Sequence, residues 1–279
     1  MVDMSKATFV LVPGAWHGPG IYLAVIEKLN EHRYPTIALA LPSNGAFTSH
    51  QTFDEDVRAI RHTLTNLVNI EEKEVVLVLH SYAGVPGIEV MKDLCKKERY
   101  ANRLEGSVAR LVFIAAFKMF EGTAPADEGI KMPEWMKFDF EVCPILNLPT
   151  SCALLSAAFS KLTNTTPIIA ELLTLILSFS RKRIVTVNRE DARKIFYNNL
   201  SPGEQDKWAS ELTHQSLGVY SSKPTYTAWL HIRSTYVGGD QDKTLYVPGI
   251  ADRIDETLQR IETITVDRIE FATELGIAS

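Results

Sequence analysis

The stretch that decides the fold is VVLVLHSYAG, residues 75–84. It is an apolar run that ends in a histidine, a serine and small residues. Continuous apolar strands are typical of parallel sheets, because helices cover both faces of such sheets. A strand that runs through a serine into a helix also suggests a nucleophile elbow, a sharp turn that exposes a catalytic serine. The candidate nucleophile is Ser81.

The sequence on both sides of this stretch alternates between apolar strands and helical patterns. Predicted strands cover residues 7–14, 36–42, 74–80, 109–117, 234–240 and 261–266. Predicted helices cover residues 21–32, 52–68, 84–98, 247–260 and 268–277. A strand, a crossover helix and a second parallel strand form the repeating unit of doubly wound sheets. We therefore predict an α/β fold with a doubly wound, mostly parallel sheet.

The alternation stops after Phe120 and returns with the strand pattern of residues 234–240. Residues 121–215 contain several helical patterns and no clear strand, except for a possible one at 184–187. We predict that 121–215 form an inserted helical cap, or lid. Residues 1–120 and 216–279 are then the two parts of the core.

Part of the predicted cap, residues 143–179, is unusually apolar. Three prolines, Lys161 and Glu171 interrupt it, so it lacks the run of about 18 apolar residues that a membrane-spanning helix needs. We expect buried or interfacial helices there. They would cover a site for a hydrophobic small molecule, with Trp135 near the substrate, or form a homodimer interface.

The composition disfavours several classes of function. The 279 residues carry a net charge of −5 and no basic block, which argues against a nucleic-acid partner. Cys95, Cys143 and Cys152 are odd in number and lack a C-x-x-C spacing, so we expect neither a disulfide framework nor a zinc site. The sequence shows no secretory signal layout, nucleotide-binding loop or cluster with metal-ligand spacing. We expect a reduced, cytoplasmic protein without a cofactor or a metal.

The residues around Ser81 depart from the G-x-S-x-G pattern of a nucleophile elbow. Ala83 keeps the second small position, but Leu79 replaces the first glycine and makes the approach to the turn more crowded. Position favours the elbow, because the motif follows an apolar strand and precedes a helix. The alternative is a serine that merely caps the following helix.

A second signal lies in LVPGAWHGPG, residues 11–20, directly after the first predicted strand. Acyl transfer requires two N–H groups aimed at the developing oxyanion. One would come from Tyr82, the residue after the nucleophile, and the other from the first loop, where Gly14, Ala15 and Trp16 lie. The alternative is an ordinary glycine-rich turn with Trp16 in the core. His17 either faces a ligand or bonds to the backbone as a structural histidine.

Four stretches together resemble the α/β-hydrolase superfamily: FVLVPGAWHGPGIY (9–22), FDEDVRAI (53–60), VVLVLHSYAG (75–84) and STYVGGDQDKTLYVP (234–248). The most similar branch holds plant hydroxynitrile lyases, methyl-ester esterases and related small esterases. The resemblance covers about the first 120 residues and residues 195–266. It implies that Ala15 supplies the oxyanion donor of the first loop. Pro13 departs from the family, which usually has histidine there.

The resemblance also places the acid of a catalytic triad after the strand at 234–240. Asp242 fits the family pattern better than Asp240, and the alternative is that both are turn residues. The family's histidine should follow the last strand, yet no histidine follows His231. Either residues that carry it are missing from this sequence, or the loop has been lost. His214 is the best substitute and a candidate for substrate contact.

Three functions remain open. The first is a hydrolase that uses Ser81 on an apolar ester, lactone or related carbonyl compound, with Trp16, His17, Trp135 and His214 near the substrate. The second is a non-hydrolytic lyase or cyclase, in which the pocket and the oxyanion hole orient a reactive substrate. The third is a catalytically inactive binding protein.

Overall fold

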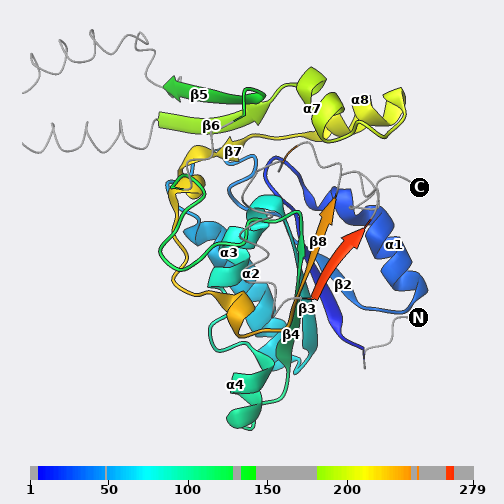
Figure 1. Cartoon of the computed structure of the whole chain (residues 1–279), viewed down its shortest axis with the longest axis vertical. Coiled ribbons are helices and arrows are strands. Elements are labelled where there is room, and N and C mark those ends of the chain that lie inside the picture. Colours follow the sequence, from blue (N-terminus) through cyan, green and yellow to red (C-terminus); the bar gives the residue numbers. More distant parts are fainter. Residues whose placement is uncertain are drawn as a thin grey trace, which may run out of the picture.

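A computed structural model describes residues 6–47, 49–127, 133–142, 181–239, 244 and 262–266 (Figure 1). The strands are β1 Thr8–Val12, β2 Thr36–Ala38, β3 Glu74–His80, β4 Ser107–Ile114, β5 Met136–Val142, β6 Arg181–Val187, β7 Gln215–Ser216, β8 Ser234–Gly239 and β9 Glu262–Val266. The α-helices are α1 Leu23–Glu31, α2 Asp54–Thr65, α3 Gly84–Glu89, α4 Lys96–Ala101, α7 Arg189–Ile195 and α8 Pro202–Glu211. Single turns of 3-10 helix include Ser81–Ala83, directly after β3.

The core is a six-stranded sheet of order β2-β1-β3-β4-β8-β9, in which every neighbouring pair is parallel. Figure 1 shows α1 on one face of the sheet and α2 and α3 on the other. The predicted doubly wound α/β fold and its six strands are confirmed. The chain leaves β1 toward β2 but leaves β3 toward β4, and ligands of such folds bind where the direction reverses. The loops after β1 and β3 lie at this point.

Strand β3 occupies the centre of the sheet because its side chains are apolar on both faces. Val75, Leu77 and Leu79 are fully buried, and Val78 is almost so. Burial of each such side chain stabilises the fold by roughly 1.5–3 kcal/mol. The continuous apolar run therefore makes β3 an interior strand, as predicted. Because β3 pairs in parallel with β1, its carboxyl end lies next to the loop that follows β1.

The single helix predicted over 84–98 is wrong: α3 ends at Glu89, and α4 begins only at Lys96. Asp93, between them, has a φ of 66°, which a helix interior does not allow. The N–H of Val108 donates to the carbonyl of Leu94 at 2.8 Å, which binds this segment to β4. The predicted helices at 247–260 and 268–277 lie outside the described residues.

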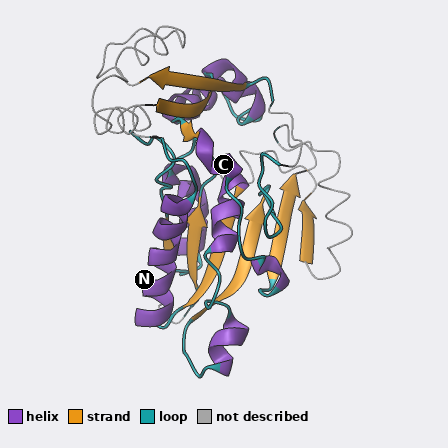
Figure 2. Cartoon of the chain, turned by 90° about the vertical axis from the view of Figure 1, so that its left-hand side faces the viewer, coloured by secondary structure: helices purple, strands orange, loops and turns teal. Residues whose placement is uncertain are grey.

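A second, antiparallel sheet of order β5-β6-β7 lies beyond the carboxyl ends of the core strands, as both cartoons show (Figure 2). β6 contains the strand suspected at 184–187, whereas β5 contradicts the prediction that 121–215 hold no other strand. The signal was present in MKFDFEV, where apolar and polar residues alternate with the period of a strand. The division of the chain into a core and a cap stays a prediction.

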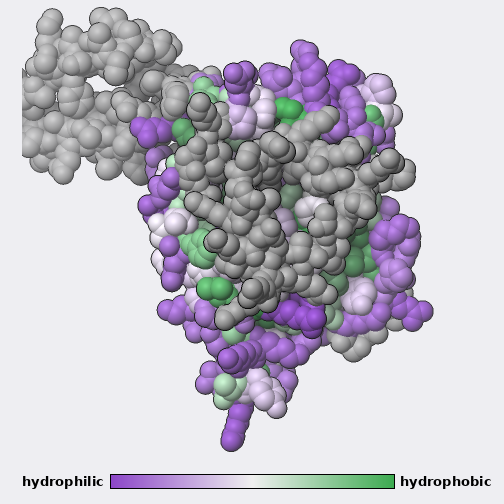
Figure 3. Space-filling view, in the orientation of Figure 1, coloured by the Kyte–Doolittle hydropathy of each residue, from purple (hydrophilic) through white to green (hydrophobic). Residues whose placement is uncertain are grey.

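The outer surface over α7 and α8 is mainly hydrophilic in Figure 3, in keeping with the exposed polar residues of both helices. The apolar stretch at 143–179, with its expected helices and dimer interface, lies outside the described residues. Among the described helices, none has the length and apolar character needed to cross a membrane.

Candidate active site

Ser81 lies at the carboxyl end of β3 in a backbone conformation that few serines adopt. Its φ is 50°, in the left-handed region, and its side chain is partly buried. Such a conformation is unfavourable for residues with a Cβ and persists where the surrounding structure enforces it. Trp16, after β1, and Ala115, after β4, also have positive φ, at 67° and 41°. Three non-glycine residues with positive φ therefore lie after the carboxyl ends of three neighbouring strands, β1, β3 and β4.

The crowding expected from Leu79 is relieved by a glycine on the next helix. A Cβ on Gly87 would lie 2.3 Å from Cδ2 of Leu79, so the absence of a side chain there provides the space that Leu79 needs. Gly84 lies still closer to its neighbour, since a Cβ there would meet the carbonyl oxygen of Phe117 at 2.0 Å. The N–H of Phe117 donates to the carbonyl of Ser81 at 3.0 Å. These contacts hold the turn around Ser81.

The first loop passes directly beside the serine. A Cβ on Gly14 would lie 2.7 Å from Cβ of Ser81 and 2.9 Å from Nδ1 of His80. The N–H of Gly14 donates to that same Nδ1 at 3.2 Å. The structure therefore brings together the two segments that the sequence singled out, although they are 66 residues apart.

The amides of the first loop differ in their partners. The N–H of Gly14 is engaged by His80, and that of Trp16 donates to Oδ1 of Asn44 at 3.0 Å. Within the described part of the chain, the N–H of Ala15 has no hydrogen-bond partner. Tyr82 is the second residue of its 3-10 helix, where an amide has no partner inside the helix. Among the described residues, the amides of Ala15, in the loop that contacts Ser81, and of Tyr82, the residue after it, are therefore the candidates for an oxyanion hole.

The side chain of Tyr82 is fully buried, and its hydroxyl donates to Asp56 at 2.7 Å. Asp56 also accepts two hydrogen bonds from Ser43. Burial raises the pKa of the Asp56 carboxyl, although the bonds from Ser43 and Tyr82 act in the opposite direction. No local pattern in the sequence marks Ser43, Asn44 or Asp56 as site residues, because their partners are distant in the chain.

Three aromatic rings pack beside the first loop. The ring centroids of Trp16 lie 5.7 Å from those of Trp135 and Phe196, and Trp135 lies 5.5 Å from Phe196. The indole N–H of Trp16 donates to the carbonyl of Val185 at 3.0 Å. Trp16 is buried and joins the loop to β6, while Trp135 is only partly buried. The structure therefore groups two of the predicted substrate-contact residues in one apolar cluster.

His17 is buried, and both of its ring nitrogens have partners. Nδ1 donates to the carbonyl of Ala15 at 2.7 Å, which places the ring hydrogen on Nδ1, and Nε2 accepts from the hydroxyl of Tyr197 at 2.8 Å. Burial lowers the pKa of His17 to about 4, although its bond to Ala15 opposes the shift. Burial also lowers the pKa of His80 well below its usual value. These contacts favour the structural interpretation of His17.

Because the pKa of His17 is lower in the folded protein than in the unfolded chain, the unfolded chain takes up the proton first. Stability should then fall as the pH decreases from about 6.5 toward 4, by about 2 kcal/mol between pH 7.5 and 5. We expect the free energy of unfolding of the variant His17→Asn to fall by about 2 kcal/mol less than that of the wild type between pH 7.5 and 5. Urea unfolding at both pH values measures this. Distant titrating groups contribute equally to both proteins, whereas the variant also loses the part of the lowering of the His80 pKa that is caused by the charge of His17, which acts in the same direction. Parallel losses in the two proteins would contradict the assignment.

The remaining predicted residues lie elsewhere. Nε2 of His214 donates to the carbonyl of Ala46 at 2.8 Å, so its ring N–H is directed to the loop after β2. Asp242 and Asp240 lie outside the described residues. Among the described residues, no cluster of histidine, cysteine and carboxylate side chains could hold a metal ion.

Comparison with known proteins agrees with this architecture. Residues 9–270 match the family described as "Alpha/beta hydrolase family". A curated relative, the alpha/beta hydrolase nvfD of Aspergillus novofumigatus, is 27% identical over 240 residues, which are 86% of this chain and 79% of that protein. The solved structure of polyneuridine aldehyde esterase matches 97% of this chain and 94% of its own, with a TM-score of 0.66 and 15% identity. Tomato methylketone synthase I, solved with 2-tridecanone, gives a TM-score of 0.60 at 14% identity, over 97% of this chain and 93% of its own. These two structures show likeness of fold.

Proposed function

The chain belongs to the alpha/beta hydrolase family, and from this premise we propose that it is a serine hydrolase of an apolar small-molecule ester, lactone or related carbonyl compound. The observation that carries the proposal is the position of Ser81. This residue has a positive φ at the carboxyl end of β3 and lies against the backbone of Gly14. Strained residues of this kind are concentrated at functional sites.

In the proposed reaction, Oγ of Ser81 forms a bond to the carbonyl carbon of the ester. The bond from that carbon to the alcohol oxygen breaks, and the hydroxyl proton of the serine leaves with the alcohol. Water then attacks the acyl-enzyme, which releases the acid and restores the serine. The N–H groups of Ala15 and Tyr82 would stabilise the negative oxygen of each tetrahedral intermediate.

Asp242 is the proposed acid of this site, on the resemblance to the family alone. It would orient a histidine, which removes the proton from the serine. No histidine follows His231 in the sequence, so the proposal assigns the base to no residue. His17 is buried with both nitrogens engaged, and His214 donates to Ala46, which makes both unsuited to this role.

The aromatic cluster supports an apolar substrate. Trp135 is partly buried and packs on Trp16 and Phe196 next to the first loop. Pockets for small molecules combine mostly apolar walls with few polar groups, which here are the serine and the amides. We propose that the exposed side of this cluster contacts the apolar part of the substrate.

A fluorophosphonate probe tests the nucleophile. Oγ of Ser81 would bond to phosphorus, the phosphorus–fluorine bond would break, and fluoride and the serine proton would leave. Trypsin cleavage after Lys73 and Lys92 yields a peptide in which Ser81 is the one serine. We expect the probe mass on this peptide by mass spectrometry. An unlabelled peptide from natively folded protein would contradict the proposal.

The missing histidine favours a second candidate function, a lyase or cyclase of the same pocket. A hydroxyl without a base is a poor nucleophile, whereas amides that hold an oxyanion retain their effect on a bound carbonyl compound. The two candidates differ in their dependence on the hydroxyl. Conversion of a substrate that persists in Ser81→Ala, with no acyl-enzyme in the wild type, would select the second.

A further inference from the structure

The loop between β2 and α2 lies between the two segments that supply the proposed oxyanion amides. Its residues Ser43 and Asn44 are adjacent in the chain but bind different partners. Asn44 contacts the first loop, and Ser43 contacts a carboxylate that holds Tyr82.

Asn44 makes three hydrogen bonds to the first loop, to residues before and after Ala15. Its Nδ2 donates to the carbonyls of Gly14 at 3.0 Å and His17 at 3.1 Å. Its Oδ1 accepts from the N–H of Trp16 at 3.0 Å. Trp16 has a φ of 67°, which its backbone would not favour unaided. One side chain therefore fixes the residues on both sides of the Ala15 amide, which has no partner among the residues that the structure describes.

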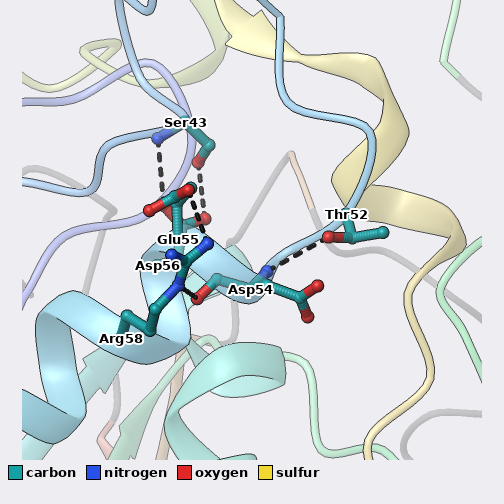
Figure 4. A network of polar contacts seen from close by, with 6 residues as sticks. All are labelled: Ser43, Thr52, Asp54, Glu55, Asp56 and Arg58. Atoms are coloured by element: carbon teal, nitrogen blue, oxygen red, sulfur yellow. Dashed lines mark hydrogen bonds and ion pairs between the residues drawn. The ribbon is translucent and has the colours of Figure 1, made fainter.

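Ser43 binds the other half of the site through Asp56. Figure 4 shows the two contacts: the N–H of Ser43 donates to Oδ1 at 2.9 Å, and its hydroxyl donates to Oδ2 at 2.6 Å. The hydroxyl of Tyr82 donates to the same Oδ2 at 2.7 Å. Both Asp56 and Tyr82 are completely buried, so bulk water does not compete for the hydrogen bonds of this network. The bond from its hydroxyl to Asp56 therefore fixes the side chain of Tyr82, and with it the turn Ser81–Ala83 that contains the Tyr82 amide.

The same loop is fixed from its other side by β7. The hydroxyl of Ser43 accepts from Nε2 of Gln215 at 2.8 Å, and its carbonyl accepts from the N–H of Ser216 at 3.0 Å. The N–H of Gly45 donates to the carbonyl of His214 at 2.8 Å. The loop is therefore a rigid support, with bonds to β7 on one side and to the site on the other.

We propose that the Ser43–Asn44 pair positions both amides of the oxyanion hole from one loop. This inference rests on the proposed function, because it assigns the amides of Ala15 and Tyr82 that role. The pair touches neither amide and acts through the backbone of the first loop and through Asp56. Misplacement of a catalytic group by about 1 Å can cost about 10²-fold in rate, so a loosened support should lower reactivity without weakening binding.

The test is the rate of labelling of Ser81 by a fluorophosphonate that carries an alkyl chain, separated into the binding constant KI and the maximal rate kinact. Asn44→Ala loosens the first loop, and Tyr82→Phe releases the elbow from Asp56. The matched controls are Asn102→Ala and Tyr100→Phe on the distant helix α4 and its end, where Tyr100 is exposed. Hydrogen exchange of peptides covering residues 11–20 and 77–90 is measured on all five proteins.

We expect kinact to fall about 10-fold to 10²-fold in both site variants, with KI unchanged and the controls at the wild-type value. Exchange should accelerate over 11–20 in Asn44→Ala and over 77–90 in Tyr82→Phe. Wild-type kinact in both site variants would overturn this inference and leave the proposed function intact. An unlabelled wild type would overturn the proposed function. In that case hydrogen exchange tests the positioning role by itself, and unchanged exchange over residues 11–20 in Asn44→Ala would overturn it. If Asn44→Ala does not fold, Asn44→Ser, which keeps one short donor, takes its place.

Discussion

Replacement of Ser81 by alanine should lower the hydrolysis of a p-nitrophenyl alkanoate, measured as kcat/KM, by about 10³-fold or more. The variant keeps the Cβ and the left-handed backbone, so the pocket and the two amides stay in place while the attacking oxygen is removed. Ser210→Ala, on the exposed surface of α8, is the matched control and should retain full activity. Equal activity of both variants would exclude Ser81 as the nucleophile.

A second substitution at the same position separates chemistry from backbone strain. Ser81→Gly should be as inactive as Ser81→Ala but more stable than it by about 1 kcal/mol, because glycine adopts a φ of 50° without the steric cost of a Cβ. Urea unfolding of the two variants measures the difference. A less stable Ser81→Gly would mean that the left-handed conformation of this turn carries no strain.

Substitution of Gly84 by alanine should have the largest effect on stability, a loss of about 3 kcal/mol or more in the free energy of unfolding. The added Cβ would lie 2.0 Å from the carbonyl oxygen and 3.0 Å from the carbonyl carbon of Phe117. These are backbone atoms and cannot rotate away, so α3 or the chain after β4 must move. Phe117 bonds to the carbonyl of Ser81, and labelling of Ser81 should therefore weaken as well.

The control for this substitution is Gly203→Ala in the first turn of α8. A Cβ there would meet no atom within 4 Å, and alanine is the better helix former, so stability should change by less than about 1 kcal/mol. Urea unfolding midpoints, with the slope of the transition compared between variants, measure both effects. Similar midpoints for the two variants would show that the contact between α3 and Phe117 is loose.

The sequence predicts the six strands of the core correctly because each is a local property. Apolar runs such as residues 75–79 must be buried on both faces, and this requirement holds whatever lies next to them. Local patterns fail where a distant partner decides the structure. The segment 84–98 has a helical pattern throughout, yet its middle binds to β4, and the alternation in MKFDFEV is satisfied only by pairing with β6.

The sequence by itself determined the class of fold and the place of Ser81, because a strand that ends in H-S-Y-A-G and begins a helix can be recognised within ten residues. Only the tertiary structure decided how the turn is accommodated and what surrounds it. Leu79 fits because Gly87 lies opposite, and the backbone on both sides of Ala15 is held because Asn44 bonds to its neighbours. Such contacts join residues that are far apart in the chain. Their geometry follows from how the strands and helices pack, and a pattern of residues that are neighbours in the sequence carries no information about that packing.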